Sequence, residues 1–134
     1  MVKANNAQEQ CWILIGKRDP GSGKWRVRKR SRSRGTFASV EADWQWTLSR
    51  EEEYGDVMGF YHTHPDSVGA EPSSRDVRTM RAWSSCLGKP LLCLIRSRRK
   101  TEAYVFKNDA DPGRPLEIES IRSNSFVIKQ ENHD

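Results

Sequence analysis

Short apolar runs and alternating stretches recur along the chain, and the first of them predict paired strands. Residues 11–16 form an apolar run typical of a buried strand, and the Pro- and Gly-rich residues 19–23 predict a turn. Residues 24–34 alternate between cations and other side chains, which is the period of a strand. The chain is therefore expected to open with a β-hairpin.

The middle of the chain predicts one more strand before a helix. We expect residues 36–46 to form a strand, or a strand that enters a loop. A helix is expected to begin at Ser49, because the glutamates that follow it suit the positive end of a helix dipole. Residues 57–62 predict another strand, and residues 62–72 contain too many Pro and Gly residues to be regular.

A second helix follows that irregular segment. Ser73 and Asp76 have the spacing of a capping box, so they predict where this helix begins. Val77, Met80 and Trp83 give the helix an apolar stripe, and a glycine at position 88 predicts its end.

Alternation of strands with helices indicates an α+β or α/β-like fold. Residues 90–95 and 101–106 predict strands on either side of a basic turn, and residues 116–128 alternate again. The length fits one domain over residues 1–134, and we expect frayed ends at about residues 1–7 and 129–134.

Composition narrows the class of protein. The chain has 134 residues, of which 35% are hydrophobic, and its aromatic residues allow a real core, to which we assign Ile13, Phe60, Trp83 and Leu94. No apolar run is long enough to span a bilayer, and the polar start lacks the apolar region of a signal peptide. The 3 cysteines form no CxxC pair. We therefore expect a cytoplasmic protein without disulfides and without membrane contact.

Two histidines and an aspartate carry the candidate chemistry. His62 and His64 lie two residues apart at the end of a predicted strand, so both imidazoles project from one face. Asp76 lies in the first turn of the next helix, where its carboxylate can fold back toward them. Two histidines and one carboxylate occupy three positions around a zinc ion and leave the fourth for water, which is the pattern of a catalytic site.

Each of these residues also has a simpler interpretation. Paired histidines are more often surface groups or hydrogen-bonding core residues than ligands. Asp76 can be a helix N-terminal acid and Ser73 an N-cap. The joint spacing favours the metal site, because the simpler interpretations would have to coincide within a short segment.

The combined pattern resembles the signature of the JAMM (MPN+/JAB) zinc metalloproteases. His-x-His-Pro is followed by seven residues and then by Ser-x-x-Asp, and Gly-Phe-Tyr precedes the first histidine. The resemblance extends from about Glu9 to about Leu116. The span from His64 to Asp76 is one residue longer than the commonest family spacing, and we expect the extra residue in the loop 66–71.

The resemblance implies a fold and a set of site residues. The fold is a single MPN/JAMM (cytidine-deaminase-like) domain with a curved mixed β-sheet flanked by helices. The cofactor is Zn²⁺, held by His62, His64 and Asp76. Ser73 would donate a hydrogen bond to the oxyanion that forms during catalysis.

The resemblance also implies a glutamate as general base at the entry of the first core strand. Glu9 is the match, because residues 9–16 resemble the corresponding family segment. Glu41 and the acidic run Glu51–Glu53 remain rivals for this role.

The implied substrate is the amide bond after the C-terminal tail of ubiquitin or a ubiquitin-like protein. Small size and a prokaryotic style of motif suggest, by analogy, a bacterial deubiquitinase-like isopeptidase in an antiviral ubiquitination-like operon. The alternatives are a processing peptidase for a ubiquitin-like or sulfur-carrier precursor, and a non-catalytic MPN scaffold. The sequence identifies neither the ubiquitin-like protein nor the oligomeric state.

The remaining feature is a run of alternating cations in a chain of formal net charge +5. Its period predicts that they share one strand face. A solvated outer face is the simplest interpretation. The alternatives are a face that steers an acidic partner toward the zinc cleft and a nucleic-acid site, and we do not expect nucleic acid. The cations are Lys24, Arg26, Arg28, Arg30, Arg32 and Arg34.

Overall fold

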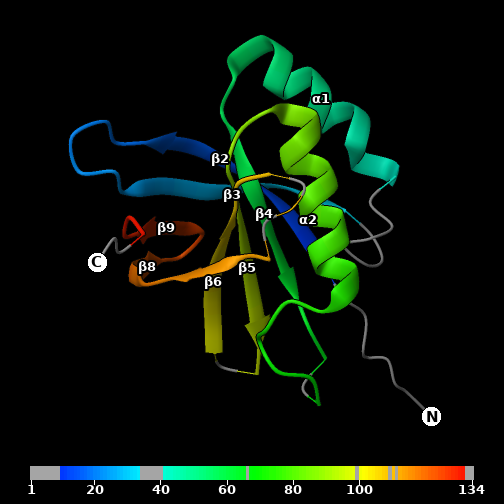
Figure 1. Cartoon of the computed structure of the whole chain (residues 1–134), viewed down its shortest axis with the longest axis vertical. Coiled ribbons are helices and arrows are strands. Elements are labelled where there is room, and N and C mark those ends of the chain that lie inside the picture. Colours follow the sequence, from blue (N-terminus) through cyan, green and yellow to red (C-terminus); the bar gives the residue numbers. More distant parts are fainter. Residues whose placement is uncertain are drawn as a thin grey trace.

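The computed structural model describes residues 10–33, 41–65, 67–98, 100–108, 110 and 112–131. Within these residues the chain forms a mixed sheet of eight strands and two helices (Figure 1). The elements in chain order are β2 (Cys11–Arg18), β3 (Trp25–Ser33), α1 (Glu41–Tyr54), β4 (Val57–Thr63), α2 (Ser74–Leu87), β5 (Leu91–Ser97), β6 (Lys100–Phe106), β7 (Arg114–Leu116), β8 (Ile118–Arg122) and β9 (Ser125–Ile128).

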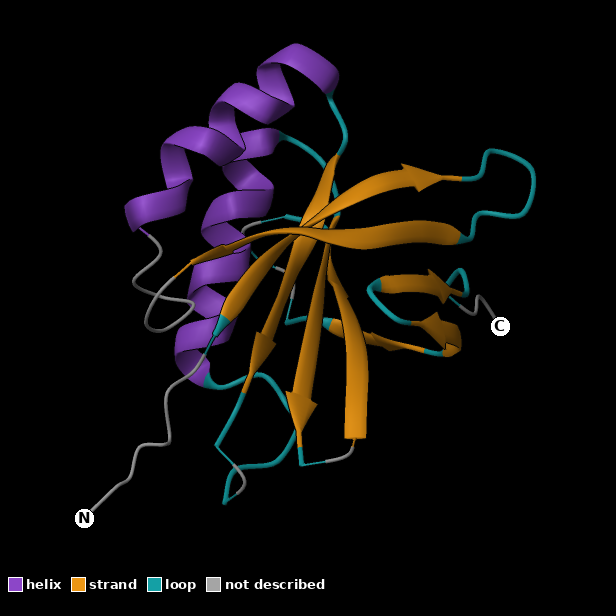
Figure 2. Cartoon of the chain, turned by 180° about the vertical axis from the view of Figure 1, so that it is seen from behind, coloured by secondary structure: helices purple, strands orange, loops and turns teal. Residues whose placement is uncertain are grey.

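The strand order across the sheet is β7-β6-β5-β4-β2-β3-β9-β8. The central neighbours β4 and β5 are parallel, and α2 makes the crossover between them. Both helices lie on one face of the sheet, as Figures 1 and 2 show from opposite sides. The predicted fold class, an α+β domain with a curved mixed sheet flanked by helices, is confirmed.

The sheet separates two apolar cores. The core under the helices contains Ile13 and Phe60, with Trp83 packed against it, and the core on the other face contains Leu94. These assignments agree with the sequence analysis. The second core is closed by residues of the β8–β9 hairpin, whose Phe126 belongs to the same cluster as Leu94.

A register shift in β4 decides which face its histidine occupies. Leu14 pairs with Gly59 and Ile15 pairs with Val57, so Met58 is an extra residue on β4. Val57 and Phe60 consequently both face the helix-side core, which strict alternation forbids. His62 follows Phe60 by two residues and lies on the helix side because of this shift.

Two predictions are wrong within the described residues, namely the strand expected over residues 36–46 and the helix start expected at Ser49. Helix α1 begins at Glu41, eight residues before Ser49, and Glu41 is therefore not the strand residue that we considered. Trp44 and Trp46 imitate the alternation of a strand. In the helix, Trp46 packs against the core, and the side chain of Trp44 stays 42% exposed.

The prediction that six cations share one strand face is also wrong. A register shift between β2 and β3 makes Arg30 an extra residue, so positions before and after it belong to opposite faces. Arg26 is paired with Asp19 at 2.8 Å, and Lys24 is paired with Glu119 at 2.7 Å. Arg34 lies outside the described residues.

An odd-numbered cation of β3 lies among aromatic rings instead. The Nζ atom of Lys29 is 3.9 Å from the ring centre of Tyr61 and 4.6 Å from that of Trp12. Cation–π attraction of this kind stabilises a partly desolvated ammonium group. Burial still lowers the pKa of Lys29.

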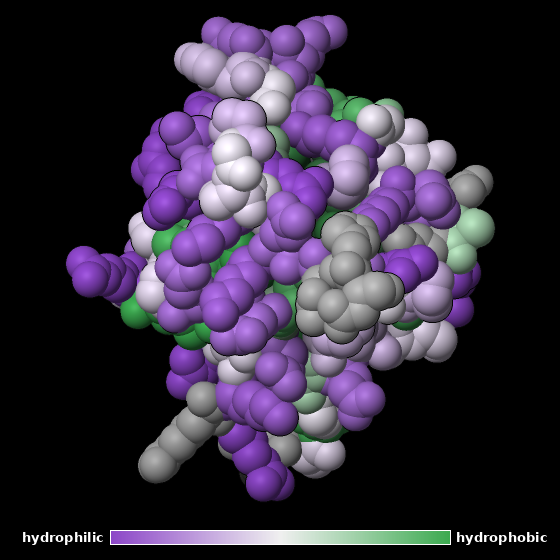
Figure 3. All heavy atoms as spheres, turned by 60° about the vertical axis from the view of Figure 1, so that its left-hand side comes forward, coloured by the Kyte–Doolittle hydropathy of each residue, from purple (hydrophilic) through white to green (hydrophobic). Residues whose placement is uncertain are grey.

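The described surface is mostly polar. Figure 3 shows one face on which hydrophilic side chains predominate and hydrophobic ones appear as small areas between them. Neither described helix has the length and apolar character that a membrane span requires.

We predict that Gly59→Ala destabilises the protein by about 1–3 kcal/mol or more. Gly59 has φ +152°, and a Cβ atom there would lie 2.0 Å from the carbonyl oxygen of Leu92 on β5. The methyl group would therefore force the parallel pair β4–β5 apart. Urea unfolding measures the change in unfolding free energy, and Gly21→Ala, in an open turn, is the matched control. Equal stability of the two variants would contradict the prediction.

Candidate metal centre

Three buried side chains meet where β4 leads into α2. His62 lies on β4, His64 follows the strand by one residue, and Asp76 is the third residue of α2. Their exposed fractions are 0%, 7% and 3%. Their candidate ligand atoms all lie within 4.8 Å of one another. The structure therefore brings together the three residues predicted to hold a metal.

The spacing of these atoms fits a tetrahedral ion. The Nε2 atoms of His62 and His64 are 3.3 Å apart, and Nε2 of His62 is 3.2 Å from Oδ1 of Asp76. Two ligands bound to zinc at about 2.0–2.1 Å in tetrahedral geometry are about 3.3 Å from each other. The observed distances thus match two edges of a zinc tetrahedron.

Hydrogen bonding fixes the tautomer of His64. Its Nδ1 atom is 2.7 Å from the carbonyl oxygen of Gly69, which can only accept, so Nδ1 carries the hydrogen. Neutral His64 then presents the lone pair of Nε2 to His62 and to Oδ2 of Asp76, which is 2.9 Å away. The lone pair on Nε2 of His64 therefore points toward the other two candidate ligands, as the binding of a metal ion requires.

Asp76 belongs to the helix cap as well as to the cluster. Its Oδ2 accepts a hydrogen bond from the backbone N–H of Ser73 at 2.9 Å, and its own N–H donates to Oγ of Ser73 at 3.1 Å. Burial favours the protonated acid, but the hydrogen bond with His62 and the N–H of Ser73 favour the carboxylate, and the pKa of Asp76 lies well below its usual range. The carboxylate is therefore held ionised, as a metal ligand must be.

Two buried cysteines, Cys11 and Cys93, lie in the core beside the cluster. Cys11 pairs with His62 across β2 and β4, and Cys93 lies on β5 in the same core. Burial, followed by the negative charge of Asp76, raises the pKa of Cys93 well above its usual range. Cys93 therefore remains a neutral thiol that fills space.

Ser73 is the N-cap of α2, as the simpler interpretation predicted. Its hydroxyl oxygen accepts from the N–H of Asp76, which does not use the hydrogen of the hydroxyl. The same side chain can therefore cap the helix and donate to a bound group.

The predicted general base, Glu9, lies outside the described residues. The neighbouring Gln10 is described, and its N–H donates to Oγ1 of Thr63, between the two histidines, at 2.9 Å. The side chain of Glu41 is also outside the described part of the chain.

The other rivals lie at the far end of β4. Oε1 of Glu51 accepts from the N–H of Val57 at 3.1 Å and from Nζ of Lys89 at 2.9 Å. His62 follows Val57 by five positions along the strand, which is about 16 Å. This placement argues against Glu51 as the general base.

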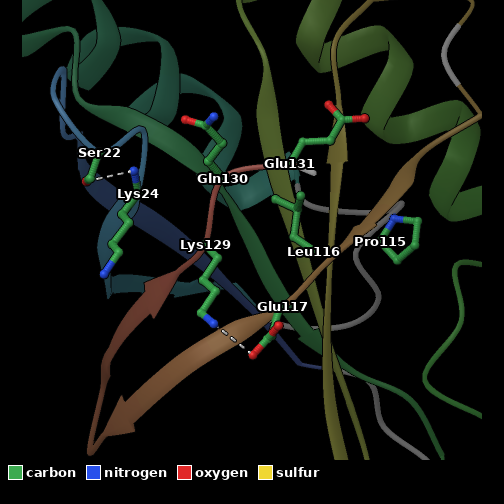
Figure 4. A pocket seen from close by; sticks show the side chains of 8 residues that line it. All are labelled: Ser22, Lys24, Pro115, Leu116, Glu117, Lys129, Gln130 and Glu131. Atoms are coloured by element: carbon green, nitrogen blue, oxygen red, sulfur yellow. Dashed lines mark hydrogen bonds and ion pairs between the residues drawn. The ribbon is translucent and has the colours of Figure 1, made fainter. Parts of the chain in front are cut away.

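One pocket of the described residues lies elsewhere and shares no residue with the metal cluster. It has a volume of about 620 Å³ and is lined by residues from the β2–β3 turn, β7 and the end of β9 (Figure 4). Its Lys129 and Glu117 pair with each other at 3.2 Å. We assign it no part in the chemistry.

Sequence reasoning missed the residues that hold the loop beside His64. Ser97 on β5 donates to the carbonyl of Val68, and the hydroxyl of Tyr104 on β6 donates to the carbonyl of Ala70 at 3.2 Å. No local pattern marks either residue, since the contacts depend on how distant strands pair.

Comparison with known families agrees with this geometry. The profile of prokaryotic homologs of the JAB domain matches residues 1–107, which include both helices and strands β2 to β6. No curated protein matches the chain.

We predict about one zinc ion per chain in purified protein, measured by elemental analysis. The double variant His62→Ala, His64→Ala should lose it, because both nitrogen ligands are gone. The matched control is His133→Ala, which removes the third histidine of the chain. Retention of zinc by the double variant would show that the ion is bound elsewhere.

A second prediction separates the two roles of Asp76. Asp76→Asn and Asp76→Ala should both lose zinc, but only Asp76→Asn keeps an oxygen for the N–H of Ser73. In chelator, Asp76→Ala should therefore be less stable than Asp76→Asn by about 1–3 kcal/mol. Urea unfolding of the zinc-free variants tests this, and equal stability would refute the shared cap.

Proposed function

The chain belongs to the family of prokaryotic homologs of the JAB domain, and on this premise we propose that it is a JAMM-type zinc isopeptidase. Its substrate would be the amide bond after the C-terminal tail of ubiquitin or a ubiquitin-like protein. The observation that carries the proposal is the buried cluster of His62, His64 and Asp76, whose ligand atoms have the spacing of a tetrahedral ion.

The chain supplies the remaining groups that amide hydrolysis needs. When bound, zinc supplies Lewis acidity, which lowers the pKa of water and polarises a carbonyl group. Glu9 accepts a proton from the attacking water and returns it to the leaving amine. The hydroxyl of Ser73 donates a hydrogen bond to the oxyanion as the carbonyl carbon becomes tetrahedral, which is worth roughly 3 kcal/mol of barrier.

Retention of the ligand set favours an enzyme over a non-catalytic scaffold of the same fold. A scaffold has no need for three buried ionisable side chains, because burying a carboxylate is costly unless it is paired. The cost at Asp76 is offset by the two histidines and the cap of α2.

We further propose a cellular role and a compartment for this activity. The enzyme would remove a ubiquitin-like protein from its targets in a bacterial conjugation system with an antiviral role, in the cytoplasm. Cys11, Cys86 and Cys93 form no disulfide in the described part of the chain, which suits a reducing compartment. The alternative is a peptidase that trims a ubiquitin-like or sulfur-carrier precursor.

The test uses two substrates built from one ubiquitin-like protein. One carries it on a lysine side chain through an isopeptide bond, and the other is a linear fusion that represents a precursor. Zinc-loaded wild type should cleave the isopeptide conjugate. Glu9→Gln should keep its zinc and lose about 10²–10⁴-fold in rate, since an amide has the size but not the basicity of the carboxylate.

Glu41→Gln and Glu52→Gln are the control variants. Full activity of Glu9→Gln together with loss in Glu41→Gln would transfer the general-base role to Glu41. Cleavage of the linear fusion alone would favour the processing peptidase. Zinc-loaded protein that cleaves neither substrate would contradict the proposed function.

A further inference from the structure

The loop between β4 and α2 is held by side chains from three strands. Gly69 accepts from Nδ1 of His64 at 2.7 Å, at the end of β4. The carbonyl before it, Val68, accepts from Oγ of Ser97 on β5, and the carbonyl after it, Ala70, accepts from the hydroxyl of Tyr104 on β6 at 3.2 Å. Hydrogen bonds from side chains thus hold three consecutive carbonyl groups of one irregular segment.

The outer two bonds determine where the middle carbonyl lies. Val68 and Gly69 are themselves exposed, and the segment has no regular structure of its own. A local turn bond from the N–H of Val68 to the carbonyl of Pro65 closes its start at 2.9 Å. Beyond that turn, Ser97 and Tyr104 bracket Gly69 and restrict its displacement.

Both donors come from rigid surroundings. The side chain of Ser97 is on a central strand, and the residue is 6% exposed. Tyr104 packs its ring against the helix-side core. Burial raises the pKa of Tyr104, so its hydroxyl stays protonated and able to donate.

Resting on the proposed function, we propose that Ser97 and Tyr104 are positioning residues of the metal centre. By holding the carbonyls of Val68 and Ala70, they keep the carbonyl of Gly69 against Nδ1 of His64. This contact holds the imidazole ring of His64 with Nε2 directed toward His62 and Asp76. The hydroxyls of both residues donate to carbonyls of the loop, so they act on the ligands through the loop.

The length of the loop gives this support a purpose. Each added residue increases the conformational freedom that must be lost when the loop is ordered. Eleven residues lie between His64 and Asp76. The hydrogen bonds of Ser97 and Tyr104 offset this entropy cost beside Gly69, the residue through which the loop contacts His64.

The experiment measures zinc affinity directly, by competition with a chromophoric chelator. Ser97→Ala and Tyr104→Phe should each weaken zinc binding about tenfold, and the double variant by up to about 100-fold, which is the range typical of groups that orient ligands. Ser97→Thr should restore the affinity, because it restores the hydroxyl. Matched controls are Ser85→Ala on the exposed side of α2 and Tyr54→Phe on α1, both of which should bind zinc as wild type does.

Two further readouts separate positioning from a loss of structure. The zinc-free variants should show the far-ultraviolet circular dichroism of zinc-free wild type. Substitution with Co²⁺ should give altered visible bands in Ser97→Ala and Tyr104→Phe but unaltered bands in the controls. Tyr104→Phe keeps its ring in the core, so it provides the test even if Ser97→Ala does not fold.

The outcomes distinguish this inference from the proposed function. Unchanged zinc affinity and unchanged Co²⁺ bands in folded Tyr104→Phe would overturn the inference and leave the isopeptidase proposal intact. Weakened affinity in both single variants, with rescue by Ser97→Thr, would support it even if wild type cleaves no ubiquitin-like substrate. Wild type that binds no zinc would overturn both.

Discussion

The site depends on one carboxylate that two parts of the fold must share. Asp76 is the third residue of α2, and its Oδ2 accepts from the N–H of Ser73 while the same group faces His62 and His64. A capping box can form only where the helix begins, so the start of α2 fixes the distance between the carboxylate and the imidazoles. The start of α2 therefore places one carboxylate both for the helix cap and for the ligand set.

The histidines depend on an irregularity of the sheet. Without the extra residue Met58, strict alternation would turn His62 toward the opposite face, away from α2. The parallel pairing of β4 and β5 brings the end of β5 to the same edge, where the N–H of His64 donates to the carbonyl of Arg96 at 2.9 Å. One inserted residue and one strand pair thus place both imidazoles before any metal is considered.

The ligand set could be predicted from the sequence because its geometry is local. His62 and His64 share a face by strand period, and Asp76 has a place set by helix capping. The simpler interpretations of Asp76 as a helix N-terminal acid and of Ser73 as an N-cap are confirmed. The two register shifts and the hydrogen bond of Ser97 could not be predicted, because they depend on the pairing of segments that are distant in the sequence. Helix α1 could not be predicted because the spacing of its tryptophans imitates a strand.

The hairpin formed by β8 and β9 lies beyond the 107 residues that the family profile matches, yet its Phe126 and Ile128 belong to the second core. This order along the chain has a consequence during synthesis, which proceeds from the N-terminus. The ligands and both helices leave the ribosome first, so the helix-side core can assemble while translation continues. The opposite face, with Leu92 and Leu94, keeps its apolar side chains uncovered until the last strands emerge. That face is therefore the last part of the described core to be covered, after the metal-binding half has been synthesised.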